Sequence, residues 1–296
     1  MKCVRDIEYD RGRLCDVYLP DGEAPFPVVI WLHAGGWRFG DRRSAPDLVQ
    51  YYAADGYAMV SIDYRLSGEA KFPAQVEDVK TAVRWVRAEA SRYGFDPARV
   101  GLWGSSAGGH LAAIAAFSPA GSFESADCAY PEHSSAVQAV VDCYGPVDFL
   151  KLDEHRAEAA AHYGGAGSKW KANAADSFES RLIGGPIQEF PERARVANPA
   201  AWVSESVPPV LMVHGAEDMD VPAAQSELLY HELVIRRARA AICLFSGLGH
   251  CFLESGAPAR DCVKREYRPG CGERVSRSVS TPYDIIGRFL AESFSR

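Results

Sequence analysis

Continuous apolar runs, each followed by glycine, proline or polar residues, recur along the chain and are typical of strands that are buried on both faces. We predict such strands over 27–33, 57–62, 99–103, 137–144, 209–213 and 240–245. Segments with helical composition or periodicity separate most of them, over 45–55, 73–94, 107–117 and 223–238, and a last one follows over 282–294. Strands that alternate with helices form βαβ units, so the pattern predicts an α/β protein with a mainly parallel, twisted sheet and helices on both faces.

The beginning of the chain follows a different pattern. Apolar and polar residues alternate over 2–8 and 13–19, on either side of Asp10-Arg11-Gly12. Such alternation around a glycine-containing turn predicts an antiparallel hairpin, which we place at the edge of the sheet. With these two strands the sheet is expected to contain about eight. We expect the whole chain, 1–296, to form a single domain.

Residues 149–205 interrupt this alternation of strands and helices. The segment contains short stretches rich in alanine and glycine, has no clear strand, and carries the aromatic residues Trp170, Phe178, Phe190 and Trp202. Aromatic side chains favour a packed unit over an extended linker. Open α/β sheets bind ligands beyond the carboxyl ends of their strands. We therefore expect 149–205 to be a small inserted cap that lies over those ends.

A serine flanked by glycines joins one predicted strand to the helix that follows it. Gly104 and Gly108 each lie two residues from Ser106. On such a turn the serine backbone is strained and its hydroxyl projects above the sheet, while the glycines let strand and helix approach closely. The helix N-terminus favours negative charge that develops at this point. Ser106 is therefore the candidate nucleophile, and the neighbouring Ser105 is interpreted as scaffold.

A serine nucleophile needs a base, and histidine is the usual one. Among the eight histidines of the chain, His250 lies in the loop after the strand predicted over 240–245. Loops that leave the same edge of a parallel sheet converge, so His250 is expected near Ser106. Other histidines fall in helical or inserted segments, and His33 is better placed to brace the glycine turn that follows it.

The base in turn needs an acid that fixes its tautomer and stabilises its protonated form. Glu217, Asp218 and Asp220 all follow the strand predicted over 209–213, and their spacing alone does not choose between them. Further carboxylates at 142, 148 and 153 follow a different strand. One of the first three is therefore expected to complete the site.

Attack on a carbonyl group creates an oxyanion, which needs hydrogen-bond donors that are already in place. Gly35 and Gly36 directly follow a predicted buried strand and can aim their backbone N–H groups at such a site. The N–H group of Ala107, beside the nucleophile, is expected to complete this oxyanion hole. Trp37, next to the glycines and beneath the expected cap, is predicted to contact the substrate.

Taken together, several motifs are similar to those of the α/β-hydrolase esterases. They are His33-Ala-Gly-Gly-Trp-Arg-Phe-Gly-Asp41, Asp63-Tyr-Arg-Leu66 with Phe72-Pro73, Gly104-Ser-Ser-Ala-Gly-Gly109, Tyr144-Gly-Pro-Val-Asp148, His214-Gly-x-x-Asp218-x-x-Val-Pro222 and Gly249-His250. The chain most resembles the bacterial carboxylesterases described as feruloyl-esterase-like (BD-FAE), which are related to the hormone-sensitive-lipase branch. The resemblance extends over about residues 5–255 and implies the α/β-hydrolase fold.

The resemblance implies a catalytic triad of Ser106, Asp218 and His250, and it selects Asp218 among the candidate acids. It also implies a hydrolase without cofactor that acts through an acyl-enzyme on small acyl or aryl esters, including acetyl or feruloyl esters of plant polysaccharides. The chain departs from the family pattern in two places. Ala34 replaces a glycine, and the segment 254–280 is longer than expected and has no assigned role.

Two other functions remain open at this stage. An amide hydrolase of the kynurenine formamidase type has a similar glycine motif, and the fold also serves as a ligand-binding module where the catalytic histidine is lost. Because His250 is present, the binding module is the weaker alternative. The aromatic residues of the expected cap favour a short pocket, and hence small acyl groups or aryl acids over long lipid chains.

Composition narrows the class of partner but leaves the compartment open. The formal net charge of -7 and the lack of a basic stripe argue against nucleic acid as a partner. There is no apolar run long enough for a membrane span and no signal peptide at the start, so we expect a soluble protein, cytoplasmic or secreted with its signal removed.

The eight cysteines permit disulfides or simply buried thiols, and they show no metal-binding spacing. Oligomeric state is not predictable from the pattern.

Overall fold

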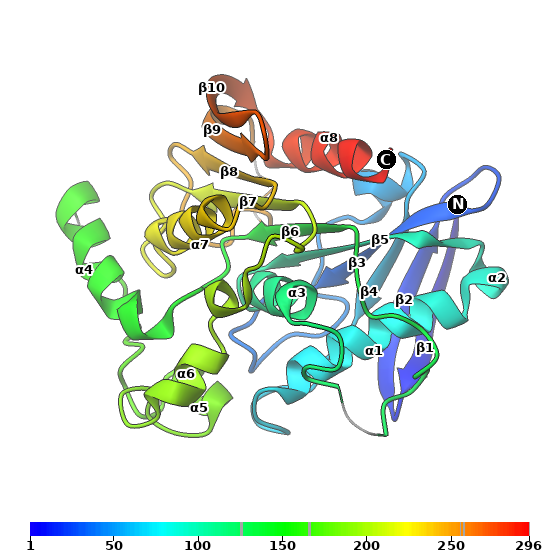
Figure 1. Ribbon diagram of the computed structural model, residues 1–296, viewed down its shortest axis with the longest axis horizontal. Coiled ribbons are helices and arrows are strands. Elements are labelled where there is room, and N and C mark those ends of the chain that lie inside the picture. Colours follow the sequence, from blue (N-terminus) through cyan, green and yellow to red (C-terminus); the bar gives the residue numbers. More distant parts are fainter. Residues whose placement is uncertain (125–126, 165–166, 255, 257, 296) are drawn as a thin grey trace.

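A computed structural model describes residues 1–124, 127–164, 167–254, 256 and 258–295. One ten-stranded sheet crosses the molecule in the order β1-β2-β4-β3-β5-β6-β7-β8-β9-β10 (Figure 1). The strands are β1 (Lys2–Asp10), β2 (Arg13–Leu19), β3 (Phe26–Leu32), β4 (Ala58–Ile62), β5 (Phe95–Ser105), β6 (Ala139–Cys143), β7 (Val210–Gly215), β8 (Ala240–Phe245), β9 (Arg260–Arg268) and β10 (Gly272–Ser280). The six strands from β3 to β8 are parallel to one another, and the strands outside them pair antiparallel.

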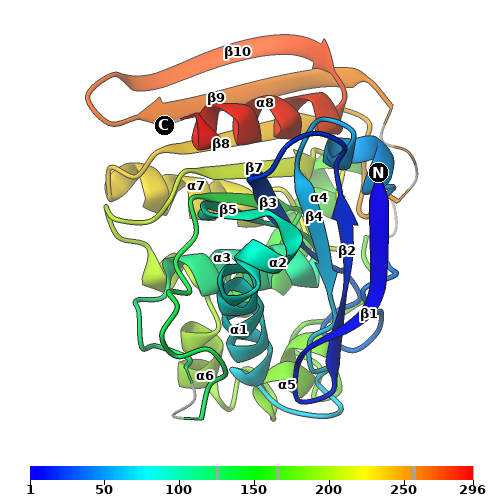
Figure 2. The ribbon, with the colours of Figure 1, turned by 90° about the vertical axis from the view of Figure 1, so that its right-hand side faces the viewer.

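Helices cover both faces of the sheet (Figures 1 and 2). They are α1 (Ala74–Ala88), α2 (Ala90–Tyr93), α3 (Ala107–Phe117), α4 (Leu152–Tyr163), α5 (Phe178–Ile183), α6 (Pro191–Val196), α7 (Ala224–Ile235) and α8 (Pro282–Phe294). Apolar residues of α1, α3 and α7 belong to one hydrophobic core, and those of α8 belong to a second core on the other face. The prediction of an α/β-hydrolase fold with two covered faces is confirmed.

The predicted strand number was too low because one hairpin was missed. Residues 260–280, which had no assigned role, form β9 and β10, and the sheet therefore has ten strands rather than about eight. The two strands are joined by a turn that contains Pro269 and Gly270, a pair of residues that commonly marks a turn. The strands themselves are rich in arginine and serine, so they lack the apolar pattern on which the other predictions depended.

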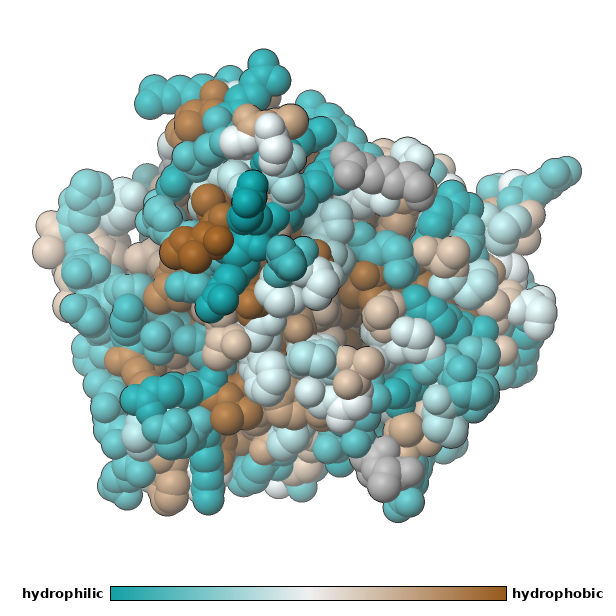
Figure 3. All heavy atoms as spheres, in the orientation of Figure 1, coloured by the Kyte–Doolittle hydropathy of each residue, from teal (hydrophilic) through white to brown (hydrophobic). Residues whose placement is uncertain are grey.

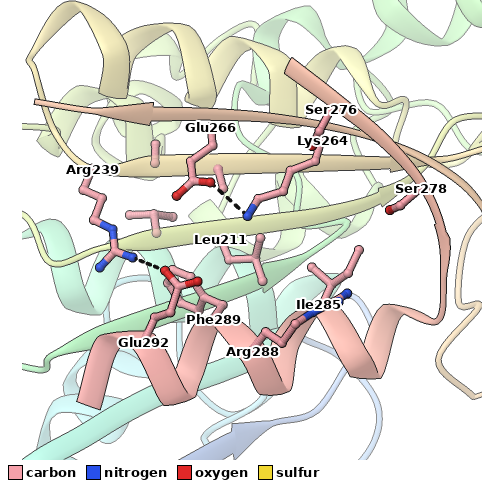
Figure 4. A pocket seen from close by; sticks show the side chains of 13 residues that line it. Leu211, Arg239, Lys264, Glu266, Ser276, Ser278, Ile285, Arg288, Phe289 and Glu292 are labelled. Atoms are coloured by element: carbon pink, nitrogen blue, oxygen red, sulfur yellow. Dashed lines mark hydrogen bonds and ion pairs between the residues drawn. The ribbon is translucent and has the colours of Figure 1, made fainter. Parts of the chain in front are cut away.

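Ion pairs line a cavity between this hairpin and α8, and one of them joins the two elements. Figure 4 shows Lys264 facing Glu266 and Arg239 facing Glu292 around a cavity of about 270 Å³. The two ion pairs measure 3.1 Å and 2.8 Å, and Arg268 also reaches Glu292 at 3.0 Å. Partly exposed pairs of this kind each contribute on the order of 0–1 kcal/mol, so they orient the hairpin more than they stabilise it.

The helix predicted over 45–55 is largely absent. Only a short irregular turn, Val49–Ala53, is present, and Tyr51 and Tyr52 depart from helical backbone angles within it. The Tyr52 hydroxyl donates to the carbonyl oxygen of Tyr283 at 2.9 Å, and its ring packs edge-on against Trp103. The backbone follows this packing of a buried ring, which overrides the local helix propensity.

The insertion consists of short helices. It contains α4, α5 and α6, with single 3₁₀ turns at Phe149–Lys151 and Pro199–Trp202, and its described residues form no strand. Figure 1 shows α4 at the left edge of the view and α5 and α6 below it and nearer the centre. On the face drawn in Figure 3, polar residues predominate and apolar residues form small separate patches.

Candidate active site

Ser106 lies on the turn between β5 and α3. Its backbone has φ +52° and ψ −118°, a conformation that is rare for a residue with a side chain and that indicates strain. The turn is held by a hydrogen bond from the Ser106 N–H group to the carbonyl oxygen of Cys143, at 2.8 Å. A side chain at Gly104 would overlap Gly108, and one at Gly108 would overlap Leu32. The glycines are therefore needed for the close approach of strand and helix.

His250 links Ser106 to Asp218. Its Nε2 lies 3.0 Å from the Ser106 Oγ, and its Nδ1 lies 2.6 Å from one Asp218 oxygen. The three residues follow β5, β7 and β8, so parallel strands bring them to one edge of the sheet. The other two candidate acids have different hydrogen-bond partners. Glu217 accepts a hydrogen bond from the N–H group of Gly247 at 3.0 Å, and Asp220 accepts one from the hydroxyl group of Ser168 in the insertion.

A second histidine contacts Asp218, which the sequence reasoning did not identify. His214 is fully buried, and its Nε2 lies 3.3 Å from the Asp218 oxygen that faces His250. Its two ring nitrogens also lie 2.7 Å from the Ser226 hydroxyl and from the Val221 carbonyl oxygen. The spacing His-Gly-x-x-Asp was noted as a motif, but it gave no indication that the histidine would contact the acid.

The electrostatics of this group stabilise the imidazolium form of His250 relative to an isolated histidine. Burial opposes ionisation of Asp218, but the adjacent His250 and His214 more than offset it and hold the pKa of Asp218 well below its usual range. Burial also opposes protonation of His250, and the Asp218 carboxylate more than offsets this and raises the pKa of His250 above its usual value. The carboxylate thus stabilises the imidazolium form that a general base reaches after it accepts a proton.

The His250 ring is also fixed by packing. Tyr144, which follows β6, contacts it edge-on with ring centroids 4.9 Å apart. Tyr144 is itself fully buried and packs against Phe252 at 4.8 Å. Hydrogen bonding from one side and aromatic packing from another leave the imidazole a single orientation.

The glycine turn after β3 faces the same edge of the sheet. Gly35 has φ +115° and Gly36 has φ +59°, and a Cβ atom at Gly35 would overlap the Phe39 carbonyl oxygen. Gly36 packs beneath the ring of Phe178 from α5, which a Cβ atom would approach to 2.8 Å. Within the described part of the chain, the N–H groups of Gly35, Gly36 and Ala107 have no backbone acceptor. Both glycines and Ala107 border the cavity that contains the Ser106 hydroxyl.

Trp37 borders this cavity but is mostly enclosed by the protein. Its side chain is nearly completely buried, and its indole N–H group donates to Nδ1 of His110 at 3.2 Å. The Nε2 of His110 therefore carries the proton, which it donates to the Ala197 carbonyl oxygen at 2.7 Å. Burial lowers the pKa of His110 to about 4, so its ring is neutral. Through these two hydrogen bonds, Trp37 and His110 connect the glycine turn to α3 and to the insertion.

The insertion supplies one wall of the cavity, whose volume is about 360 Å³. Arg156, Trp170, Phe178 and Glu179 come from the insertion and lie across from Ser106 and His250. Trp170 and Phe178 pack at 5.1 Å between ring centroids. The cavity therefore has an aromatic wall together with one buried cation and one buried carboxylate.

The cysteines of the chain form no disulfides among the described residues. All eight cysteines are free thiols, and Cys15, Cys143 and Cys243 are buried, as expected for thiols that act as small apolar groups. Cys251 borders the catalytic cavity. In the part of the chain that the structure describes, no cluster of three metal-ligating side chains occurs. No helix there has the length and apolar character needed to cross a membrane.

Comparisons with curated proteins identify esterases as relatives. Esterase LipC of Mycobacterium tuberculosis (strain ATCC 25618 / H37Rv) is 32% identical over 231 residues, which cover 77% of this chain and 53% of that protein. Esterase LipQ of the same strain is 33% identical over 258 residues, which cover 82% of this chain and 55% of that protein. The chain thus spans about half the length of these relatives.

Solved structures are similar over more of the chain. A truncated form of a carbohydrate esterase from gut microbiota is 27% identical, with a TM-score of 0.80, and the match covers 100% of this chain and 97% of that one. A bifunctional GH43-CE protein of Bacteroides eggerthii is 30% identical, with a TM-score of 0.71, over 86% of this chain and 37% of that one. A family model described as BD-FAE matches residues 15–233. The chain therefore belongs to the BD-FAE family.

Proposed function

We propose that the protein is a serine carboxylester hydrolase whose catalytic residues are Ser106, His250 and Asp218. The observation that carries the proposal is the continuous hydrogen-bonded line from the Ser106 Oγ through His250 to Asp218, at 3.0 Å and 2.6 Å. A strained serine, a base that is oriented by a buried acid and a row of free N–H groups are the parts that acyl transfer requires. The esterase names of the relatives support the same reaction class.

The reaction follows from the positions of these groups. His250 takes the proton of the Ser106 hydroxyl as its oxygen bonds to the ester carbonyl carbon. The carbonyl oxygen becomes an oxyanion, for which the N–H groups of Gly35, Gly36 and Ala107 are the available donors. His250 then returns the proton to the leaving alcohol as the carbon–oxygen bond breaks and an ester of Ser106 remains. Water, activated by the same His250, hydrolyses this acyl-enzyme and restores the serine.

The cavity supports small acyl or aryl groups as substrates. Its volume of about 360 Å³ lies near the lower end of the range for small-molecule sites. Trp170 and Phe178 provide a surface on which a planar group can pack. Two similar structures are described as a carbohydrate esterase and a bifunctional GH43-CE protein, which supports acetyl or aryl esters of polysaccharides as substrates.

A panel of substrates tests this proposal. Wild type, Ser106→Ala and, as a matched control, Ser105→Ala are compared on p-nitrophenyl acetate, butyrate and decanoate, methyl ferulate, acetylated xylan and N-formylkynurenine. We expect hydrolysis of the short or aryl esters, a loss of at least about 10⁴-fold in Ser106→Ala, and retention of activity in Ser105→Ala. Ester hydrolysis that persists in Ser106→Ala would exclude this nucleophile. Turnover of N-formylkynurenine alone would assign an amide hydrolase instead, and preference for decanoate would exclude the short pocket.

A further inference from the structure

A buried carboxylate faces the catalytic cavity and has no part in the mechanism above. Glu179 lies in the first turn of α5, immediately after Phe178, and only 5% of its surface is exposed. Glu179 borders the cavity that contains Ser106, so it can contact a ligand there. Burying a charged group is unfavourable unless partners satisfy it, so its presence in this wall needs an explanation.

The protein satisfies Glu179 only in part. The nearest cation is the Arg156 guanidinium, whose closest nitrogen lies 3.8 Å away, beyond hydrogen-bond distance. Arg156 directs its other nitrogens to Asp153 at 3.0 Å and to the carbonyl oxygens of Asp220 and Trp170. Burial raises the pKa of Glu179 despite this arginine and despite hydrogen bonds from the Ser177 hydroxyl and from the backbone N–H group of Glu179 itself. A carboxylate accepts more than two hydrogen bonds, so Glu179 retains capacity for a further donor inside the cavity.

The charge around this wall restricts what that donor can be. Arg156 and Glu179 both border the cavity, and Arg156 directs its nitrogens to Asp153 and to backbone carbonyl oxygens of the protein. The negative charge of Glu179 therefore disfavours a carboxylate or phosphate group of the substrate at this point of the wall. A neutral hydroxyl group can donate to Glu179 without bringing in a charge.

Aromatic residues beside Glu179 form a surface that can hold a substrate with a hydroxyl group close to this carboxylate. Phe178 is the preceding residue of α5, and its ring lies 5.1 Å from Trp170 and 6.3 Å from Phe39, between centroids. All three aromatic residues border the cavity. A sugar or phenol ring that packs against them brings its hydroxyl groups near the adjacent carboxylate.

We propose that Glu179 is a substrate-binding residue that accepts a hydrogen bond from a hydroxyl group of the ester, so that the cavity selects neutral, hydroxyl-bearing esters. The proposal rests on the proposed esterase function. Arg156 supports Glu179 because its charge lowers the pKa of this carboxyl group against the effect of burial. Arg156 also joins the insertion to the loop that carries Asp218, through a 2.8 Å hydrogen bond to the Asp220 carbonyl oxygen.

Matched pairs of esters test this inference on either side of the scissile bond. Methyl ferulate is compared with methyl 3,4-dimethoxycinnamate, whose phenolic hydroxyl is blocked, and glycerol monoacetate is compared with propyl acetate. A third pair, acetylcholine and 3,3-dimethylbutyl acetate, differs in positive charge and not in hydroxyl groups. The variants are Glu179→Leu, which removes the acceptor, and Glu179→Gln, which keeps an uncharged acceptor of the same size. Glu192→Gln on the exposed surface of α6 is the control.

The readout is the ratio of kcat/KM within each pair, which a general loss of stability does not change. We expect wild type to prefer the hydroxyl-bearing ester in at least one pair. This preference should fall about tenfold or more in Glu179→Leu, fall less in Glu179→Gln, and be unchanged in Glu192→Gln. Because the hydrogen bond forms with bound substrate, the change should appear mainly in KM.

The outcomes separate this inference from the proposed function. Ester hydrolysis with no hydroxyl preference in wild type, or with a preference that survives Glu179→Leu, overturns the role of Glu179 and leaves the esterase proposal intact. A Glu179-dependent preference for acetylcholine alone also overturns it, because the carboxylate would then bind a cation. A folded wild type that hydrolyses none of the six esters overturns both proposals.

Discussion

Asp218 uses its two carboxylate oxygens for two different purposes. One oxygen accepts the backbone N–H groups of Asp220 and Val221, at 2.9 Å each, which fixes the side chain to its own loop. The other faces His250 and His214. Because the carboxylate cannot rotate without losing the backbone bonds, it holds the His250 ring with Nδ1 toward the acid and Nε2 toward the serine.

Replacing Asp218 by asparagine should change both the rate and its pH dependence. The carboxylate raises the pKa of His250, and a base must be neutral to act, so its removal should lower that pKa and move the acidic limb of the kcat/KM profile to lower pH. The rate itself should fall by roughly 10³ to 10⁴. The measurement is p-nitrophenyl acetate hydrolysis across pH. Glu217→Gln, beside it in the loop, should retain the wild-type profile, and an unshifted limb in Asp218→Asn would contradict the assignment.

His110 should make the protein less stable in mild acid. Its pKa is about 4 in the folded protein, against about 6.5 in an unfolded chain. Between these values the unfolded chain binds a proton that the folded protein does not, so the stabilising contribution is complete above pH 6.5 and is lost as the pH falls toward 4. We expect the free energy of unfolding to fall by about 2–3 kcal/mol more in wild type than in His110→Gln between pH 7.5 and 4.5. Denaturant unfolding at both pH values measures this, and equal losses would show that His110 titrates normally.

At the scale of elements, the insertion is seated directly on the catalytic turn. Phe178 at the start of α5 covers Gly36, and His110 of α3 donates to Ala197 of the insertion. The contact between Gly36 and Phe178 therefore joins the expected oxyanion hole to the wall of the substrate cavity. A shift of α5 should change both the binding of the substrate and the stabilisation of the oxyanion.

Substituting alanine for Gly36 should disturb this contact. The new Cβ atom would lie 2.8 Å from the Phe178 ring, on a backbone with φ +59°. We expect kcat/KM to fall by about 10²-fold, because displacement of the turn or of α5 misplaces donors and substrate. Gly12→Ala is the matched control, since Gly12 has φ +80° in the β1–β2 turn with open space around it. Both variants should lose about 1–2 kcal/mol of stability, and only Gly36→Ala should lose activity. Equal activities of Gly36→Ala and Gly12→Ala would show that Gly36 has no role in the active site.

At the scale of the whole molecule, the elements predicted correctly are those whose position is marked by a pattern of apolar residues. The six parallel strands, the N-terminal hairpin and the nucleophile helix lie where the apolar runs predicted them. The hairpin over 260–280 was missed because its strands are polar, and the helix over 45–55 was wrong because a buried tyrosine sets the backbone there.

The same distinction applies to the candidate site. Ser106 and His250 followed from local motifs and strand order, but residues alone did not choose Asp218 over its neighbours. Glu179 has no sequence signal, because its importance comes from how the insertion folds back over the strand ends. The role of His110 likewise has no local signal, since both of its hydrogen-bond partners are distant in sequence.

The most direct test of the central claim is the mass of the protein after reaction with a p-nitrophenyl phosphonate, with the modified peptide identified. The account predicts one adduct per chain, on the peptide that contains Ser106, with esterase activity lost in proportion to labelling and no adduct in Ser106→Ala. An adduct on another residue, or an unlabelled protein that still hydrolyses esters, would contradict the assignment of Ser106 as the nucleophile.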